Sequence, residues 1–595
     1  MGYVGPRSAP DVLLDGLRRL EYRGYDSAGV ALEDDGSIYL RRKAGALRVL
    51  EELLRETPPP ASHTGIGHTR WATHGGVSDR NAHPHTDCDG LIAIVHNGII
   101  ENADELRAEL LAAGHTLRSD TDSELVAHML EGEGDLRERL GHVARRCEGA
   151  YALLVMDARD PGRLVAVRRT SPIAIGATAE EAFVGSAALA LAPWLSECIY
   201  LDDGEIADVR PGKIEVFRLL DLEPIAKVLH PIESDGEMPD TGEHGTFFRK
   251  ELMEQPIAWR NVMAGRLDDL GTVDLSGDGI EPEFLRDVER VVFLAMGTAL
   301  HACQMAVERL GEELQIPAQA ELASEFRDTR SFLEPGTLAV AVSQSGETID
   351  TLTALRHARA MGAKVLSLVN VPGSTIARES DMVLDLRAGI EISVASTKAF
   401  TTMVIALELL TAALGQAKGC PLPAADLQTL RAVPIVAEDF LSALSLPQAF
   451  IDACAAAPGV IYLGRGQDLS LAREGSLKLK ELSYVWSEAF AAGELKHGPL
   501  ALVDGRVPVI VCATDQRHAV KLRSSLAEAT ARGAFGVAVG SDLGATLQIP
   551  LPLKERVGAY LLAALPLQLL AVEVAEARGC PIDQPRNLAK SVTVE

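Results

Sequence analysis

Residues 339–348 read AVAVSQSGET, and residues 509–516 read VIVCATDQ. Each stretch begins as a short apolar run and ends in small polar residues, and an amphipathic helical pattern follows it. Short apolar strands that alternate with amphipathic helices are typical of βαβ units, which build parallel sheets. The region after residue 285 is therefore predicted to have an α/β fold.

The same region contains an internal repeat. VVFL at 291–294 recurs 169 residues later as VIYL at 460–463, and SEFR at 324–327 recurs at the same offset as GELK at 493–496. Together with the two opening stretches, these matches occur in the same order in both copies. The second half of the chain is therefore predicted to be two copies of one α/β domain.

The chain separates into regions of different texture. Before residue 215, short β-like runs accompany an acidic helical stretch after Asn102. The next region is irregular and rich in proline, as a linker is, although residues 247–260 have a helical pattern. The predicted boundaries are 1–215 for a first domain, 216–281 for the linker, 282–422 and 451–585 for the two α/β copies, and 586–595 for a C-terminal tail.

Composition limits the classes of partner. A length of 595 residues exceeds one hydrophobic core, and 47% hydrophobic with 24% charged residues is typical of a soluble globular protein. The net charge of −27 repels phosphate backbones and anionic lipid heads, so neither nucleic acid nor a membrane surface is expected as a partner. A phosphorylated ligand would have to be bound by backbone amides, hydroxyls and a few placed cations.

The eight cysteines are scattered and form no CxxC pair, which argues against a zinc ribbon or a disulfide scaffold and favours a reducing cytoplasm. No charged-then-apolar leader opens the chain, so secretion is not expected. The apolar run 559–572 contains Pro566 and Gln568 and is too short to span a bilayer. We expect a buried helix there.

The turn SQSGET at 343–348 is the clearest phosphate-binding signal. It opens a predicted helix, and backbone amides at a helix start stabilise an anion. An ordinary N-cap is the alternative, but Gln344 and the hydroxyls of Ser343, Ser345 and Thr348 exceed what capping needs. In the second copy Asp515 occupies the equivalent turn and would repel a phosphate. We therefore expect one phosphate site, in the first copy.

Three further candidates for catalysis lie near the end of the chain. Lys478 and Glu481 share a helix face and are suited to moving a proton beside a sugar carbonyl, although composition favours a solvated ion pair. His497 lies in a Gly/Pro-bounded loop, where an acid/base role and a packing role are equal alternatives. Lys590 is suited to forming an imine, although the composition of the C-terminal tail favours a surface lysine on a frayed end.

The first domain has the groups that an amino-acid substrate requires. Arg70 is suited to clamping a carboxylate, and Asp122 to binding an ammonium group. Asn97 and the amide of Gly98 follow an apolar strand and can form an oxyanion hole, although Asn-Gly is also a common turn. The His83-Pro84-His85 segment has no acidic partner at ligand spacing, so no metal is assigned.

Taken together, these segments resemble the glutamine–fructose-6-phosphate aminotransferase (isomerizing) family, the glucosamine-6-phosphate synthases. The resemblance covers essentially the whole chain. It is carried by RGYDSAG at 23–29, GHTRWATHG at 67–75, HNGIIEN at 96–102, SQSGET at 343–348, ASTKAFTT at 395–402, GELKHGP at 493–499 and DQPRNLAKSVTVE at 583–595.

The resemblance implies an α+β and α/β multidomain protein: an N-terminal Ntn-type glutaminase sandwich followed by two doubly wound sugar-isomerase (SIS) domains. It implies conversion of D-fructose 6-phosphate and L-glutamine to D-glucosamine 6-phosphate and L-glutamate, the first step of hexosamine synthesis. Ammonia released by the glutaminase would pass through a channel to the sugar site. A cytoplasmic homodimer without a cofactor is expected.

The resemblance also implies residue roles. The glutamine pocket and oxyanion hole would consist of Arg70, Trp71, Thr73, His74, Asn97, Gly98 and Asp122, with Trp71 also gating the ammonia channel. The sugar phosphate would be bound by Thr298, Ser343, Gln344, Ser345, Thr348, Val394 and Ser396. Glu481, beside Lys478, would move the proton between C1 and C2, His497 of the other subunit would open the ring, and Lys590 would form the imine.

Two positions depart from the family. Its nucleophile is an N-terminal cysteine in a start like Met-Cys-Gly-Ile-Val-Gly, whereas this chain begins Met1-Gly2-Tyr3 and first has a cysteine at Cys88. We expect a misplaced gene start that omits about four residues, the nucleophile among them. Ala299 replaces a serine near the sugar phosphate, and the lost hydroxyl costs about 1 kcal/mol.

Two alternative functions remain at this point. If the chain truly starts at Met1, an ammonia-dependent isomerase with an inactive glutaminase is the alternative. A sugar-phosphate sensor is the second, because SIS domains also occur in regulators. Such regulators usually carry a DNA-binding module, and a chain of net charge −27 without a basic helix argues against that class.

Overall fold

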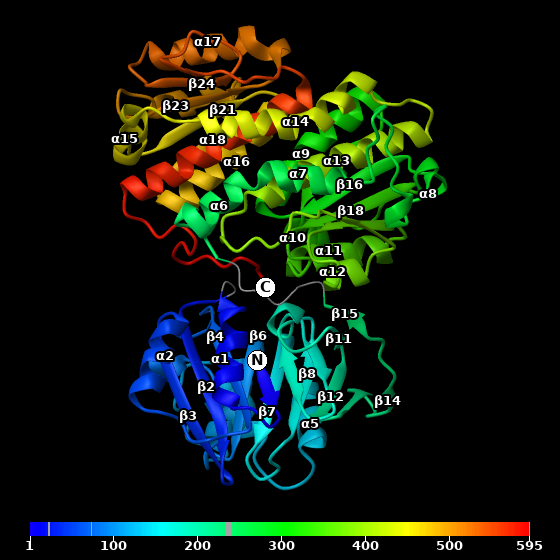
Figure 1. Ribbon diagram of the computed structural model, residues 1–595, viewed down its shortest axis with the longest axis vertical. Helices are drawn as coiled ribbons and strands as arrows, with labels where there is room; N and C mark the ends of the chain where they lie inside the picture. Colours follow the sequence, from blue (N-terminus) through cyan, green and yellow to red (C-terminus); the bar gives the residue numbers. More distant parts are fainter. Residues whose placement is uncertain (22–23, 73, 233–239, 594–595) are drawn as a thin grey trace. The chain divides into compact units, whose positions relative to one another are not determined.

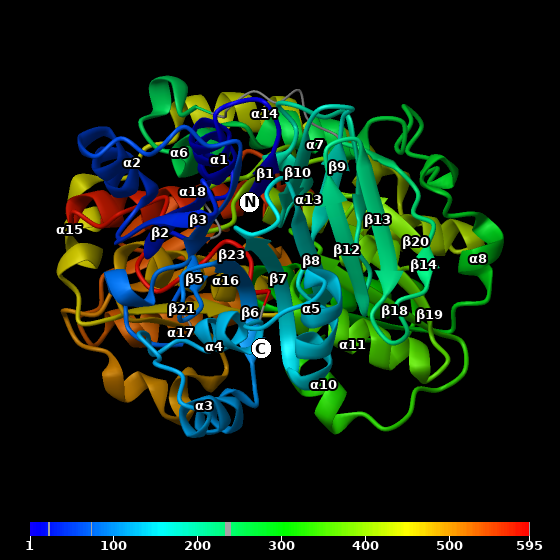
Figure 2. The ribbon, with the colours of Figure 1, turned by 90° about the horizontal axis from the view of Figure 1, so that it is seen from below.

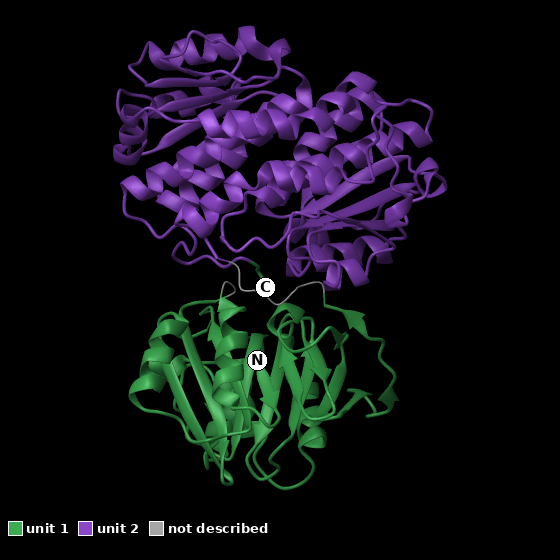
Figure 3. Ribbon diagram, in the orientation of Figure 1, with its two compact units in different colours: residues 1–239, 591–595 green, residues 240–590 purple. Residues whose placement is uncertain are grey.

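The computed structural model describes residues 1–21, 24–72, 74–232 and 240–593. The chain divides into two compact units, residues 1–239 with 591–595 and residues 240–590 (Figure 3). Each unit is described by itself below.

Unit 1 is built on antiparallel sheets. Its helices are α1 (Ala9–Arg18), α2 (Leu47–Glu56), α3 (Ala103–Ala112), α4 (Ser123–Met129) and α5 (Leu136–Arg146). Its strands are β1 (Gly2–Val4), β2 (Ser27–Asp34), β3 (Ser37–Ala44), β4 (Thr64–Arg70), β5 (His85–Thr86), β6 (Ile92–Ile100), β7 (Gly149–Asp157), β8 (Leu164–Arg169), β9 (Ala174–Ala177), β10 (Ala182–Gly185), β11 (Glu197–Tyr200), β12 (Glu205–Arg210), β13 (Lys213–Arg218), β14 (Pro224–Ile225) and β15 (His230–Pro231).

These strands form two sheets, with the orders β15-β11-β9-β10-β1-β4-β2-β3 and β14-β13-β12-β8-β7-β6-β5 (Figure 2). The two faces of strand β6 show why helices cover the outer face of its sheet. Ala93 and Val95 pack between the two sheets, whereas Ile92 and Ile94 point to the opposite face, against α3, α4 and α5. Both faces of the strand are apolar, so unit 1 is a sandwich with an outer helical layer.

Unit 2 contains the repeat. Its strands are β16 (Arg290–Ala295), β17 (Ala318–Leu322), β18 (Thr337–Ser343), β19 (Lys364–Val369), β20 (Met382–Asp385), β21 (Val460–Gly464), β22 (Ser487–Ala491), β23 (Val509–Ala513), β24 (Gly536–Gly540) and β25 (Leu547–Ile549). Its helices are α6 (Phe247–Met253), α7 (Gln255–Met263), α8 (Pro282–Arg286), α9 (Gly297–Arg309), α10 (Ala323–Thr329), α11 (Ile349–Ala360), α12 (Thr375–Arg378), α13 (Lys398–Ala417), α14 (Ala424–Ala443), α15 (Gln448–Ala456), α16 (Gln467–Ser483), α17 (Ala519–Thr530) and α18 (Arg556–Ala577), with a short 3-10 helix η7 (Glu494–His497).

The two parallel sheets have the orders β17-β16-β18-β19-β20 and β22-β21-β23-β24-β25. Both follow the sequence second, first, third, fourth, fifth, which confirms the predicted pair of α/β copies. In the second copy α17 covers one face of the sheet while α16 and α18 cover the other (Figure 1). The predicted fold class, an N-terminal sandwich followed by two α/β domains, is confirmed, with antiparallel sheets in the first and parallel sheets in the other two.

Two helices of unit 2 are long and apolar enough to cross a membrane by length and composition, α13 and α18. In each, 94% of the apolar window is buried inside the fold, so both are core helices. The prediction of a buried helix at 559–572 is confirmed, with Pro566 inside α18.

The region whose composition is typical of a linker contains regular elements on both sides of residues 233–239. Strand β13 pairs with β12 in unit 1. Helices α6 and α7 pack into the core of unit 2, where Trp259 is fully buried and its Nε1 donates to Thr401 Oγ1 at 2.8 Å. Pro224 and Pro231 lie in the two-residue strands β14 (Pro224–Ile225) and β15 (His230–Pro231), and Pro256 lies in the first turn of α7.

Candidate active sites

A pocket in unit 1 gathers most of the predicted glutamine-binding residues. Its lining includes Arg70, Trp71, Asn97, Gly98 and Asp122. Arg70 ends β4, Asn97 and Gly98 lie in β6, and Asp122 immediately precedes α4. Met1 also lines the pocket, and no cysteine is among the described residues of the lining.

Gly98 allows β6 to pass close to β7 beside this pocket. Its φ is +143°, and a Cβ atom there would lie 2.1 Å from the carbonyl oxygen of Ala150. A side chain at this position would push the two strands apart. The backbone of Asn97-Gly98 is thus held by the sheet, with both residues half-buried at the pocket.

The charged groups of the pocket are fixed by the backbone. Asp122 Oδ2 accepts from the amide of Ile100 at 2.8 Å, and the Arg70 guanidinium donates to the carbonyl oxygen of His74. Burial lowers the pKa of Arg70, and the charge of Asp122 opposes that shift. A carboxylate has about four lone-pair sites, so Asp122 retains capacity for a ligand ammonium group.

In unit 2, the SQSGET turn lies where the order of strands reverses. The first copy runs from β16 to β17 on one side and then to β18 on the other, so a crevice opens beyond the carboxyl ends of β16 and β18. Parallel α/β folds bind ligands at such a point. Thr298 begins α9 after β16, and Ser343 ends β18.

Hydrogen bonds shape this turn. Ser343 Oγ accepts from the amide of Gly346 at 3.0 Å and lies 2.9 Å from Thr348 Oγ1. Gly346 has φ +63°, and a Cβ atom there would lie 1.9 Å from Ser374 Oγ. The turn therefore requires glycine at 346. It is followed directly by α11, whose N-cap is Thr348.

The equivalent turn of the second copy binds a carboxylate of the protein itself. Asp468, fully buried on α16, accepts from the amides of Thr514 at 3.0 Å and Asp515 at 3.3 Å. Burial raises the pKa of Asp468 to about 6, against the hydrogen bonds from Thr514. The amides that could hold a phosphate are already paired, in line with the predicted loss of a phosphate site.

A buried polar cluster joins α9 of the first copy to α16 of the second. Lys478 Nζ lies 2.7 Å from Glu481 Oε2 and 3.5 Å from Glu474 Oε1, and it donates to Thr298 Oγ1 at 3.1 Å. His301 Nδ1 lies 2.8 Å from the other oxygen of Glu474. The Lys478 side chain is 1% exposed, so this is not the solvated ion pair that composition favours. Glu481, at 20%, remains accessible.

Lys590 is also held inside the fold. Its Nζ donates to the carboxylate of Glu391 and, at 2.8 Å, to the carbonyl oxygen of Ser393. Ser396 Oγ donates to Glu391 Oε2 at 3.0 Å, and the amide of Val394 donates to the carbonyl oxygen of Asp583 at 3.1 Å. Only 3% of the Lys590 side chain is exposed, so the frayed surface lysine is excluded.

One buried carboxylate, Glu391, lies close enough to influence both lysines electrostatically. Burial alone would raise the pKa of Glu391, but the charge and hydrogen bond of Lys590 and two backbone amides lower it to about 2. Burial would lower the pKa of Lys478, but Glu474, Glu481 and, more weakly, Glu391 raise it. Glu391 therefore acts electrostatically on both lysines.

Of two further predicted residues, the structure describes only His497. Thr73 lies outside the described residues. His497 is exposed in η7, and no hydrogen bond among the described residues joins it to Lys478 or Glu481. The resemblance assigns His497 to the site of the other subunit, so exposure on its own subunit is compatible with that role.

Sequence reasoning missed the carboxylates that hold the lysines, Glu391 and Glu474. Glu474 precedes Lys478 by one helical turn, a signal that was available. Glu391 precedes the ASTKAFTT segment, but its partner lies 199 residues later. It also missed Glu251 of α6, whose Oε1 accepts from the amides of Ile392 at 2.6 Å and Ser393 at 3.2 Å.

Comparison with known proteins identifies both halves. Residues 68–193 match the family described as glutamine amidotransferase domain, and residues 284–413 and 455–548 match the SIS domain family. The chain is 44% identical over 613 residues to the glutamine–fructose-6-phosphate aminotransferase (isomerizing) of Streptomyces coelicolor, with 100% of this chain and 99% of that protein covered. The protein of the same name from Symbiobacterium thermophilum is also 44% identical, over 610 residues with the same coverage.

The chain belongs to the glutamine–fructose-6-phosphate aminotransferase (isomerizing) family. Among solved structures, the C-terminal domain of the glucosamine-fructose-6-phosphate aminotransferase from Francisella tularensis is similar, with a TM-score of 0.55 and 32% identity. The match covers 58% of this chain and 100% of the Francisella tularensis chain. The family resemblance seen in the sequence is confirmed.

Proposed function

We propose that this chain transfers the amide nitrogen of L-glutamine to D-fructose 6-phosphate, forming D-glucosamine 6-phosphate and L-glutamate. Family membership over the full chain supports this reaction. The observation that carries it is a pair of buried lysines, Lys590 and Lys478, each paired with a carboxylate, with Lys478 also donating to Thr298 Oγ1 at 3.1 Å. A cytoplasmic location and a place at the first step of hexosamine synthesis belong to the same proposal.

The glutamine half hydrolyses the amide by the nucleophilic route of its family, and the cysteine that attacks the amide carbon is not among the described residues lining the pocket. Arg70 binds the substrate carboxylate and Asp122 its ammonium group, with Trp71 and His74 beside them. Asn97 and the amide of Gly98 stabilise the oxyanion of the tetrahedral intermediate, where a positioned donor contributes about 3–4 kcal/mol. One water is consumed, and glutamate and ammonia are released.

The sugar half uses the ammonia. Thr298 and the SQSGET turn hold the phosphate, with Val394 and Ser396 along the sugar. Lys590 attacks C2 of the open-chain ketose and forms an imine with loss of water, and ammonia then displaces the lysine. Glu481 moves a proton from C1 to C2, which gives the aldose. The water released here balances the one consumed by the glutaminase.

His497 opens the sugar ring as an acid/base of a second copy of the chain, so the working form is a homodimer. Its exposure in η7 leaves it available to another subunit. A symmetric dimer then has two sites, each with one histidine from the opposite chain.

The nitrogen donor provides the test. The protein, produced with its native N-terminus, is incubated with fructose 6-phosphate and either amide-¹⁵N glutamine or ¹⁵N ammonium, and glucosamine 6-phosphate is analysed by mass spectrometry. Label from glutamine in the amino group, with one glutamate per product, supports the proposal. If product forms with ammonium but not with glutamine, glutamine dependence is refuted and the ammonia-dependent isomerase is favoured. If no product forms with either donor, the aminotransferase activity is refuted.

A further inference from the structure

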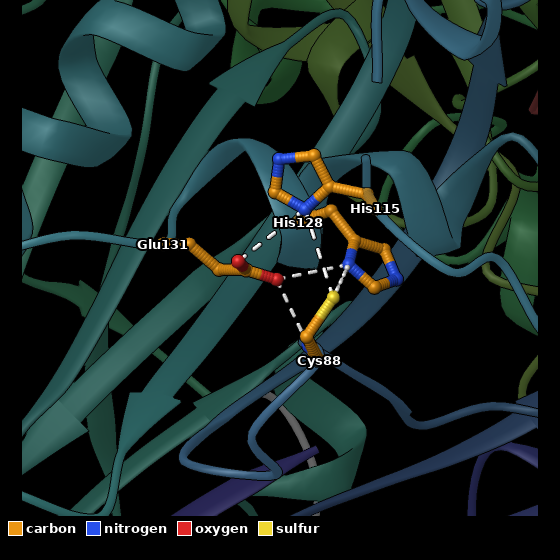
Figure 4. A group of neighbouring side chains, drawn as sticks. All are labelled: Cys88, His115, His128 and Glu131. Atoms are coloured by element: carbon orange, nitrogen blue, oxygen red, sulfur yellow. Dashed lines mark hydrogen bonds and ion pairs between the residues drawn. The ribbon is translucent and has the colours of Figure 1, made fainter. Parts of the chain in front are cut away.

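Four side chains of unit 1 point toward one another at a place outside the glutamine pocket. Cys88 lies in the loop between β5 and β6, His115 follows α3, His128 lies in the last turn of α4, and Glu131 follows that helix (Figure 4). Their ligand-type atoms, one thiol sulfur, two imidazole nitrogens and a carboxylate oxygen, all lie within 4.8 Å of one another. None of these residues takes part in the proposed reaction.

Four distances between these atoms, from 2.9 to 3.7 Å, are close to those of a tetrahedral metal site. Cys88 Sγ lies 3.3 Å from His128 Nδ1 and 3.7 Å from His115 Nδ1. The Glu131 oxygens lie 2.9 Å from His128 Nδ1 and 3.3 Å from His115 Nδ1. Zinc bonds of about 2.3 Å to sulfur and about 2.0–2.1 Å to nitrogen or oxygen would place tetrahedral ligand atoms about 3.3–3.6 Å apart.

A network of hydrogen bonds explains the positions of these four side chains less well than a bound cation does. Each Nδ1 atom faces both the sulfur and a carboxylate oxygen, yet a neutral imidazole nitrogen either donates one proton or accepts one. Once the Nδ1 proton of His128 is donated to Glu131, that nitrogen has no lone pair for the Cys88 thiol. A cation would use one lone pair from each of the four groups.

The surroundings also orient the ligands. His128 Nε2, the nitrogen away from the cluster, lies 3.7 Å from Glu124 Oε1. Glu124 is itself fixed by the amides of Arg118 at 2.8 Å and Ser119 at 2.7 Å, and the amide of Cys88 donates to Glu131 at 2.9 Å. The distance from His128 Nε2 to Glu124 Oε1 is longer than a hydrogen bond, but Glu124 lies on the side of the ring where a zinc-bound histidine usually has an outer carboxylate. The side chain of His128 is 2% exposed, so its ring is already held in the fold.

We propose that Cys88, His115, His128 and Glu131 bind one structural Zn²⁺ ion. A mixed thiolate, imidazole and carboxylate set with four ligands suits zinc among divalent cations. The ion joins the loop before β6, the segment after α3 and the end of α4. Asp122 of the glutamine pocket anchors the opposite end of α4 to β6 through Ile100, so the metal fixes the helix whose start carries Asp122.

This inference does not depend on the proposed reaction, because its primary measurement is metal content. The untagged full chain is produced with zinc in the medium, dialysed against metal-free buffer and analysed by elemental mass spectrometry. We expect about one zinc per chain in the wild type and near-background zinc in Cys88→Ala and His115→Ala. Matched controls are Cys420→Ser and His142→Asn, both at exposed positions, which should retain the metal.

A second measurement covers the case in which the variants do not fold. Zinc in the wild type is replaced by Co²⁺, and absorption spectra are recorded. A thiolate-to-cobalt charge-transfer band together with intense visible bands of tetrahedral cobalt supports the site. A wild-type chain that stays metal-free after zinc loading, or a folded Cys88→Ala variant that keeps a full equivalent, overturns it.

Discussion

Lys478 and Lys590 show at the residue scale how the fold changes what a charged side chain can do. Both are almost fully buried, and each is bonded to at least one carboxylate. Removing one partner of such a pair leaves an uncompensated buried charge, at a cost of about 3–5 kcal/mol. Glu481 differs because it is partly accessible, as its proposed contact with substrate requires.

Glu481→Gln removes the proposed base while keeping the shape of the side chain. Loss of a general base lowers turnover by about 10²–10⁴-fold. We expect this loss in glucosamine 6-phosphate formation, with binding of fructose 6-phosphate retained by calorimetry. Glu488→Gln, on the exposed part of β22, is the matched control and should retain wild-type turnover. Turnover in Glu481→Gln at the wild-type rate would exclude this residue as the base.

The buried carboxyl group of Glu251 is expected to make the stability of the fold depend on pH. Burial and the nearby charge of Glu391 raise the pKa of Glu251 to about 8. The unfolded chain ionises this group near its ordinary pKa, so the stability that it contributes at low pH is lost as the pH rises to about 8. In Glu251→Gln this loss is absent.

We therefore expect the unfolding temperature of the wild type to fall between pH 5 and pH 8 by a few degrees more than that of Glu251→Gln, since about 1 kcal/mol shifts it by about 2–4 °C. Differential scanning calorimetry measures this. Glu283→Gln, at a 71% exposed position, is the control. Parallel curves for wild type and Glu251→Gln would contradict the assignment.

At the element scale, the site depends on the turn between β18 and α11. Gly346→Ala places a Cβ atom against Ser374 at a positive φ, which disturbs the amides of the turn. We expect at least a tenfold rise in KM for fructose 6-phosphate, with glutamine hydrolysis unchanged. Gly277→Ala, at a position open to solvent, is the control. An unchanged KM in Gly346→Ala would remove the turn from the phosphate site.

The parallel sheets and the hydroxyl-rich turn before α11 could be predicted because apolar periodicity and turn composition are local properties. Burial is not local. The spacing of Lys478 and Glu481 is the same in a solvated helix and in the buried helix observed, so the sequence favoured the wrong environment. The zinc-type cluster was missed for a similar reason, because its ligands are separated by 27, 13 and 3 residues and converge only through the fold.

At the scale of the whole molecule, the proposed dimer predicts complementation between variants. Chains carrying Glu481→Gln and chains carrying His497→Ala are each expected to be inactive. When the two are unfolded together and refolded, half of the dimers are mixed, and each mixed dimer has one intact site. About a quarter of the wild-type activity should return. Activity that stays at the level of the separate variants would place His497 outside the partner's site.

In the proposed mechanism, Lys590 holds the sugar covalently during the reaction. The full chain is treated with sodium borohydride in the presence of fructose 6-phosphate, digested and analysed by peptide mass spectrometry. We expect a reduced sugar phosphate adduct on Lys590, absent from Lys590→Arg and from enzyme without sugar. An active enzyme whose adduct lies on another lysine, or that forms none, would contradict the account.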